Sequence, residues 1–379
     1  MNRFKIIYRR AAFAALLFLL NKSIYSNTLN VRALWVVRDH IITSDKIDDV
    51  IEFAARNNYN HLFVQIRGRG DAYYTSRVVP RSHLLEGTEF DPLDYIIKKS
   101  RRNNIKIHAW FNVYYLWSSL ELPTQQDHLL YTQNSWLDTE FPDPMDVEKM
   151  MEAVRKNKSA NGEGFYLAPT HPEVEAHLQN VITELVQNYK LDGIHFDYIR
   201  YHKKGWGLNP IGLKLYFNHS VSIPGLPALQ VKEKPNFNDY KRDAITNFVR
   251  KASTRIKAYQ PYCIVSAAVK PNLASARNHF GQEWDVWLSS RYIDWAVPMN
   301  YAKDLNRFDR NIQIIKDNFP AQYLDRIIMG IAVYNQKPRS SGQKVYHAVK
   351  NGFSGVSIFS YTVFKEQPTY EKKLRKYLK

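Results

Sequence analysis

The chain of 379 residues contains a single cysteine, Cys263. It can therefore form no intramolecular disulfide and no cysteine-based metal cluster. The sequence also lacks a Gly-x-Ser-x-Gly motif, a glycine-rich phosphate loop and a His-Glu-x-x-His pair. These absences argue against a serine hydrolase of that type, a nucleotide-binding domain and a zinc protease. No glycine-, serine- or proline-rich linker divides the chain, so we expect a single domain over residues 27–379.

Long hydrophobic runs are also scarce, although 45% of the residues are hydrophobic and can supply a large core. One run, residues 11–20, follows four basic residues and is too short to span a bilayer. That pattern is typical of a signal peptide, and no lipidation cysteine follows it. We therefore expect residues 1–26 to be a signal peptide or N-terminal anchor. The protein would then be exported to the periplasm, the cell envelope or the medium.

Acidic residues are outnumbered by basic ones. The formal net charge is +17, of which residues 1–26 carry five positive charges, leaving +12 for the rest. A basic balance favours acidic partners, among them an acidic polysaccharide, although scattered lysines also suit an ordinary solvated surface. We expect no nucleic-acid partner, and membrane proximity only through the N-terminal segment.

Apolar runs typical of strands alternate with amphipathic stretches typical of helices. We predict strands near residues 32–37, 61–67, 105–113, 193–200, 263–269, 295–301, 327–334 and 355–361. Helices are predicted at 44–58, 92–103, 172–189, 240–259, 282–292, 309–318, 341–351 and after 364. Eight such units favour the α/β class and a (β/α)8 TIM barrel. A doubly wound sheet would require a glycine-rich turn after its first strand, which residues 36–39 do not offer.

Two long insertions, residues 114–170 and 202–239, follow the third and fourth predicted strands. Both are rich in aromatic residues, and both should emerge at the C-terminal face of the barrel, where such enzymes build their active sites. Their aromatic side chains can stack on sugar rings or simply pack against the barrel.

The fourth predicted strand is the most informative segment. His195 and Asp197 lie on the face opposite Ile194 and Phe196, because side chains alternate along a strand. Ionisable groups on a buried strand are costly unless they line a cavity or are paired, so they indicate a functional site. The alternative is a structural pair between Asp197 and Arg200.

Neighbouring strands carry a similar pattern, with polar or aromatic residues toward their C-terminal ends. The candidates for substrate binding are Arg67, Asp71, His108, Trp110, Asn112, His195, Arg200, Asn300 and Tyr301.

Glycoside hydrolysis requires two carboxyl groups, one of which donates a proton while the other acts as nucleophile or base. We predict Asp197 as the nucleophile or base. The second group is either Asp304 or Asp71. Asp304 is favoured because it follows a strand on which Asn300 should face the site, although it can also cap a helix. Asp71 lies in a turn rich in arginine, which would hold it ionised.

The sequence resembles the bacterial glycosyl-hydrolase-like family 10 from about residue 30 to residue 361. The resemblance rests on the blocks FVQIRGRGDAYY (63–74), DPLDYII (91–97), IHAWFNVYY (107–115), HPEVEAHL (171–178), DGIHFDYIRY (192–201), VSAAV (265–269), VPMNY (297–301) and MGIAVYN (329–335). It implies a (β/α)8 barrel and an envelope glycosidase, and some relatives are thought to cut peptidoglycan strands stripped of their peptides. Members of one branch have an aspartate in the block before HPEV and two successive aspartates on the fourth strand, whereas this chain has Ala168 and a single Asp197.

The sequence therefore predicts an exported glycoside hydrolase that cleaves an acidic or amino-sugar glycan with two carboxylates and without metal or cofactor. Arginines near the mouth, among them Arg67 and Arg200, would attract the lactyl carboxylates of a stripped glycan. Two alternatives stay open: a non-catalytic glycan-binding barrel, and a metal-dependent polysaccharide deacetylase with His108, His195 and Asp197 as ligands. The sugar, the linkage and the stereochemical outcome stay open as well.

Overall fold

A computed structural model describes residues 29–140, 152, 163–218 and 236–379, so the predicted signal or anchor segment lies outside the described residues. Eight parallel strands pair in the order β8-β7-β6-β3-β2-β1-β10-β9. They are β1 (Val31–Val36), β2 (His61–Arg67), β3 (Lys106–Asn112), β6 (Gly193–Asp197), β7 (Ile264–Val269), β8 (Trp295–Pro298), β9 (Ile328–Ala332) and β10 (Gly355–Phe359). Parallel bridges at 296–327 and 299–330 join β8 to β9. The predicted TIM barrel is confirmed.

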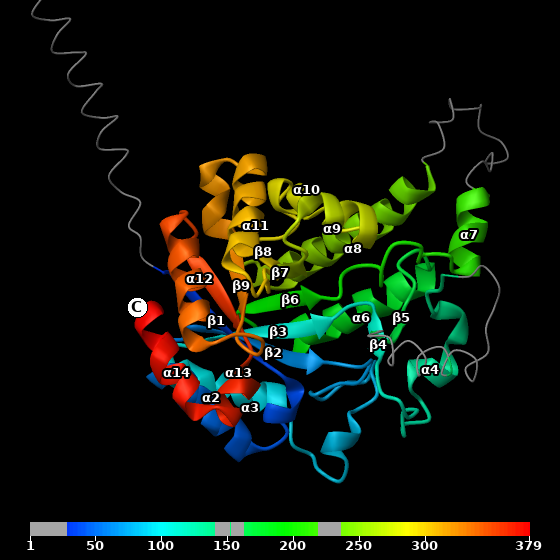
Figure 1. Ribbon diagram of the computed structural model, residues 1–379. Helices are drawn as coiled ribbons and strands as arrows, with labels where there is room; N and C mark the ends of the chain where they lie inside the picture. The colour runs from blue at the N-terminus through cyan, green and yellow to red at the C-terminus, as the bar shows by residue number, and fades with distance from the viewer. Residues whose placement is uncertain (1–28, 141–151, 153–162, 219–235) are drawn as a thin grey trace, which may run out of the picture.

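Helices surround this barrel (Figure 1). They are α2 (Ser44–Arg56), α3 (Pro92–Ser100), α6 (Pro172–Asn188), α8 (Phe237–Tyr259), α9 (Leu273–Phe280), α10 (Trp284–Ser289), α11 (Leu305–Asn318), α12 (Pro338–Lys350), α13 (Tyr361–Glu366) and α14 (Pro368–Leu374). Every predicted helix is present with shifted ends, and α9 was missed. Several begin at a side-chain cap, such as Thr43 before α2 and Asp91 before α3. None of the described helices has the length and apolar character needed to cross a membrane.

Side chains on alternate strand positions divide the core into two layers. One layer fills the space between the strands and the helices. The other fills the barrel itself and centres on Trp35, whose ring lies 5.0 Å from that of Phe63 and 4.7 Å from that of Trp110. The barrel interior is thus a packed core, as expected for eight strands, and any substrate must bind at its rim.

Two of the predicted sugar-binding residues belong to this interior. His108 Nε2 lies 2.9 Å from Nδ1 of His61, and its ring stacks on Trp295. His195 stacks on Phe63 at 4.2 Å, and its Nδ1 lies 2.8 Å from the hydroxyl of Ser266. Both histidines are fully buried. The structure therefore gives them packing roles instead of the predicted role in substrate binding, because a substrate would have to penetrate the barrel core to reach them.

The described parts of the two insertions lie where the sequence predicts them. They include β4 (Tyr115–Trp117) and β5 (Phe165–Tyr166), which pair with each other, and the helices α4 (Leu129–Thr132) and α7 (Pro210–Phe217). Figure 1 shows these elements together on the right, beyond the C-terminal ends of β3 and β6. They form the wall on one side of the barrel rim.

The interior histidines should make the stability of the protein depend on pH. Burial lowers the pKa of His61 to about 4 and that of His195 to about 3. The folded protein keeps these rings neutral, whereas the unfolded chain protonates them below a pH of about 6.5. The free energy of unfolding should therefore fall as the pH drops from about 6.5 toward about 4, by roughly 3 kcal/mol for His61.

Urea denaturation at a series of pH values measures this dependence. His61→Gln should flatten the curve over that pH window, while the same change at the exposed His83 should not. A curve of equal steepness in His61→Gln and the wild type would show that His61 is not held neutral by the fold.

Candidate active site

Asp197 ends β6, and the backbone turns sharply after it. The next residue, Tyr198, has a φ of 49°, in the left-handed region that stops the strand. The Asp197 carboxylate accepts a hydrogen bond from the backbone N–H of Tyr198 at 2.7 Å and is only 7% exposed. Burial raises its pKa to about 6, although this N–H and the charges of Arg200 and Lys270 act in the opposite direction. Asp197 can therefore hold a proton close to neutral pH.

A second carboxylate, Glu163, belongs to this site and was missed in the sequence. It precedes β5, and its Oε2 accepts hydrogen bonds from Arg200 Nη2 at 2.7 Å and from the hydroxyl of Tyr166. Burial would raise the pKa of Glu163, but the charge of Arg200 and these two hydrogen bonds outweigh it and lower the pKa. The negative charge of Glu163 in turn raises the pKa of Asp197.

Arg200 holds Glu163 in place from a buried position. Its guanidinium lies 4.9 Å from the ring centroid of Tyr198 and 5.3 Å from that of Phe280. It also donates hydrogen bonds to the backbone carbonyls of residues 201 and 202. The sequence left open a structural ion pair between Arg200 and Asp197. Arg200 does form an ion pair, but its partner is Glu163. Arg200 is a positioning residue.

Lys270 is a second cation at the site that was not predicted. It follows β7, and its ammonium lies 4.6 Å from the ring centroid of Phe280. Burial and the charge of Arg200 lower its pKa to about 8, while Glu163 and Asp197 raise it. The one feature of the sequence that could have indicated this residue is its position directly after the strand at residues 264–269.

Tyr301 is the one predicted substrate-binding residue that presents a free donor near Asp197. Its hydroxyl is buried and has no hydrogen-bond partner among the described residues. The negative charge of Asp197 acts on it and, after burial, is the largest cause of its raised pKa. A buried hydroxyl without a partner is costly, so it is poised to bond a ligand. The exposed ring of Tyr334, 6.3 Å away, stands beside it.

The prediction that Asn300 faces the site is wrong. The interior side of β8 carries Trp295 and Val297, so Asn300 points outward, toward α11. There its amide donates to the carbonyl of Phe308 at 3.0 Å.

Asp304, which was favoured partly because of Asn300, caps α11 by accepting from the backbone N–H of residue 307 at 2.8 Å. Asp304 is exposed and is not among the groups that perturb Asp197.

Arg67 also points away from the site. The pairing of β2 with β3 shifts register between Gln65 and Arg67, so Arg67 lies on the same side as Phe111 instead of the barrel side. Its guanidinium lies 5.1 Å from the Phe111 ring and donates to the carbonyl of Asn112.

Asp71 is buried in the following turn, where it accepts from the backbone N–H of residue 69 at 2.8 Å. It is likewise not among the groups that perturb Asp197.

Trp110 and Asn112 lie inside the barrel just below the rim. Trp110 Nε1 donates to Asn112 Oδ1 at 2.9 Å, and Asn112 Nδ2 donates to the carbonyl of residue 68. These bonds occupy the polar groups of two residues that were predicted to bind substrate. The described residues hold no cluster of three or more histidine, cysteine, aspartate or glutamate side chains suited to a metal ion, so the ligand set of a deacetylase is not assembled among them.

Comparison with known proteins gives a consistent result. A family model described as Glycosyl hydrolase-like 10 matches residues 30–347. Glycosyl hydrolase YngK of Bacillus subtilis is 25% identical over 68% of this chain and 49% of its own length. Glycosyl hydrolase DigH of Escherichia coli is 25% identical over 69% of this chain and 59% of its own length. The matched part therefore spans about half of these curated relatives.

Among solved structures, the glycoside hydrolase domain of PgaB (BpsB) from Bordetella bronchiseptica is similar, with a TM-score of 0.66 and 15% identity. The superposition covers 92% of this chain and 98% of that domain. At this level of identity the similarity shows the fold.

Lys270 should lower the pKa of Asp197 through its positive charge. Lys270→Gln removes that charge and should raise the pKa of Asp197 above about 6, as measured by the NMR titration of its carboxyl carbon. The matched control is Lys365→Gln, which removes a lysine paired with Asp49. An unchanged Asp197 titration in Lys270→Gln would show that the two groups do not face each other in solution.

Proposed function

The chain belongs to the glycosyl hydrolase-like 10 family, and on that premise we propose that it is an exported glycoside hydrolase of an acidic or amino-sugar glycan. Peptidoglycan strands stripped of their peptides are the substrate that we favour. The basic N-terminal segment supports export, and the positive balance of the chain supports an acidic substrate.

One observation carries the proposed chemistry: two neighbouring carboxylates with different partners, since Glu163 is bound by Arg200 and Tyr166 whereas Asp197 is buried and, among the described residues, accepts only a backbone N–H. Asp197 has a raised pKa, and Glu163 a lowered one. Such a pair suits an acid and a base, respectively. We therefore assign Asp197 as the proton donor and Glu163 as its partner. This reverses the role that the sequence suggested for Asp197 and replaces Asp304 with Glu163.

The reaction can be written with these two groups. Protonated Asp197 gives its proton to the glycosidic oxygen as the bond between that oxygen and the anomeric carbon breaks. Glu163 then attacks the anomeric carbon, or removes a proton from the water that attacks it. Oε2 of Glu163 is occupied by Arg200 and Tyr166, whereas Oε1 accepts no hydrogen bond from the described residues. Oε1 is thus the oxygen available for this step.

Lys270 and Tyr301 supply substrate contacts in this scheme. Lys270, with a pKa of about 8, is largely cationic at neutral pH and would attract a sugar carboxylate such as a lactyl group. The free hydroxyl of Tyr301 would donate to a sugar oxygen near Asp197. Tyr198 and Tyr115, whose rings stack at 4.3 Å, offer an aromatic wall beside the carboxylates.

Replacing either carboxylate should abolish hydrolysis. Asp197→Asn and Glu163→Gln should each lower kcat by about a thousandfold or more on peptide-stripped peptidoglycan strands, because each removes a group that takes part in bond breaking. Asp304→Asn is the matched control and should retain the wild-type rate. The wild-type rate should also fall as the pH rises through about 6, where Asp197 loses its proton.

A substrate with an activated leaving group distinguishes the two roles, because it requires little protonation. It should restore part of the rate of Asp197→Asn but not that of Glu163→Gln. Restoration of Glu163→Gln instead would reverse the assignment. A wild-type protein that binds the strands and releases no products would favour the non-catalytic alternative.

Tyr301→Phe separates a substrate contact from a structural one. It removes a hydroxyl that has no partner in the fold, so the free energy of unfolding should stay the same or rise slightly. KM for the glycan should rise, or kcat should fall, because the donated hydrogen bond is lost. Destabilisation by about 1 kcal/mol or more in urea denaturation would mean that the hydroxyl bonds to the protein and not to the substrate.

A further inference from the structure

A long groove runs along the outside of the barrel between α6 and α8. Its first part has a volume of about 820 Å³ and is lined from Pro172 to Asn180 on α6 and from Arg250 to Tyr259 on α8. Its second part, of about 750 Å³, continues past the C-terminal ends of both helices and is lined by residues 186–192 and 259–264 and by His61 and Lys106, which begin β2 and β3. Tyr259 lines both parts, so the two parts adjoin at this residue.

Two tyrosines expose their rings in this groove. Tyr262 is 96% exposed and Tyr259 is 50% exposed. The hydroxyl of Tyr259 accepts a hydrogen bond from Gln187 Nε2 at 3.1 Å, which fixes the orientation of its ring on the surface. Most large aromatic side chains of the described residues are buried, so two exposed rings along one groove indicate a binding surface. Tyrosine combines an apolar ring face with a polar tip, which suits a sugar ring and its hydroxyls.

The charge of the groove is positive once its ion pairs are taken into account. Its two carboxylates are paired: Glu175 with Lys251 at 2.6 Å, and Asp192 with Lys106 at 3.2 Å. Three more cations in the groove have no carboxylate partner among the described residues, namely Lys190, Arg250 and Arg255. Together with the exposed tyrosines, they favour a polymer that carries both sugar rings and negative charges.

We propose that this groove is a second, non-catalytic binding site for an acidic glycan strand. The inference takes the chemical class of its ligand from the proposed function. The groove follows the length of α6, whose 17 residues span about 25 Å. α6 precedes β6 and runs antiparallel to it, so the first residues of α6 lie toward the end of the barrel at which β6 ends in Asp197. A long strand could occupy both sites, whereas a short fragment could occupy only one. Binding of a long strand in the groove would therefore raise the effective concentration of that strand at the carboxylates.

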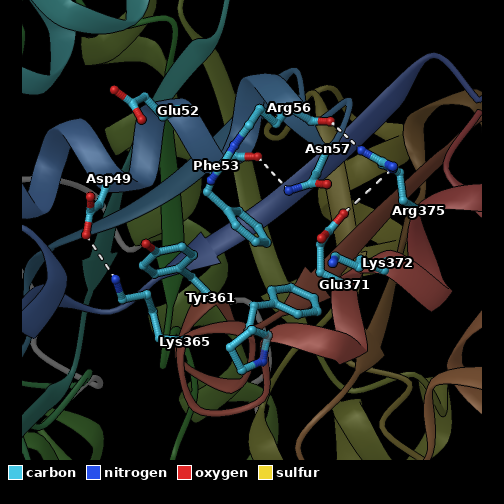
Figure 2. Close-up of a pocket in the computed structure, with 12 residues that line it drawn as sticks. Asp49, Glu52, Phe53, Arg56, Asn57, Tyr361, Lys365, Glu371, Lys372 and Arg375 are labelled. Carbon is cyan, nitrogen blue, oxygen red and sulfur yellow. Dashed lines mark hydrogen bonds and ion pairs between the residues drawn. The ribbon is translucent and has the colours of Figure 1, made fainter.

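Another hollow, of about 430 Å³ between α2 and the helices α13 and α14, lacks this combination (Figure 2). Its charges are mixed and partly paired, with Lys365 lying 2.9 Å from Asp49. Phe364 is 3% exposed and its ring stacks on that of Phe53 at 5.3 Å, so neither ring stands free in solvent as that of Tyr262 does. This hollow is not an equivalent glycan site.

Binding can be measured directly, without hydrolysis, in the Asp197→Asn background. The probe is a preparation of peptide-stripped peptidoglycan strands, and affinity is read by retardation in native gels that contain them. Tyr262→Ala should weaken binding about tenfold, since one exposed stacking surface is lost. Lys190→Gln combined with Arg255→Gln should weaken it and reduce its dependence on salt. The matched control is Tyr346→Ala, which removes a tyrosine that is 57% exposed on α12.

The same surface variants, with Asp197 restored, should hydrolyse long strands more slowly and short fragments at the wild-type rate. Equal binding of the strands by Tyr262→Ala and the control would overturn the proposal, and so would equally tight binding of DNA, which would show a cationic surface without sugar selectivity. These results are independent of the proposed chemistry. If the wild type binds strands through Tyr262 but cleaves no glycan, the groove stands and the hydrolase assignment fails.

Discussion

The ion pair between the buried Arg200 and the partly exposed Glu163 is the interaction on which the site depends. A charge removed from water, such as that of Arg200, is costly unless it is bonded on several sides. Arg200 meets this condition with two backbone carbonyls, aromatic ring faces and the carboxylate. The pair ties the segment before β5 to the turn after β6 and keeps Glu163 ionised. Asp197, beside it but not bonded to Arg200, is left with the desolvation that raises its pKa.

This arrangement explains how two carboxylates on one rim can differ in protonation. Desolvation acts on both, but only Glu163 receives hydrogen bonds from a cation and a phenol. The barrel below contributes rigidity: its interior is filled by aromatic rings and neutral histidines. The rim groups therefore rest on a packed floor, which limits how far they can move apart during a reaction.

The repeating pattern of the sequence was enough to predict the barrel, because the alternation of strands and helices is a local property of the chain. It also placed Asp197 and the two insertions at the C-terminal face. The errors concern which way side chains point. A register shift turned Arg67 outward, and the interior side of β8 was assigned to the wrong residues, so that Asn300 was misplaced. Neither error could be seen without the pairing of the strands.

The sequence by itself determined the fold, the family resemblance and one carboxylate of the candidate site, Asp197. Only the tertiary structure joined Glu163 to Asp197, because the two residues are separated by a helix and meet only when β5 packs beside the end of β6. The same holds for Lys270, which reaches the site from β7. Local patterns report which face of an element is buried, but the pKa of a carboxylate is set by neighbours from distant parts of the chain, and only folding brings them together.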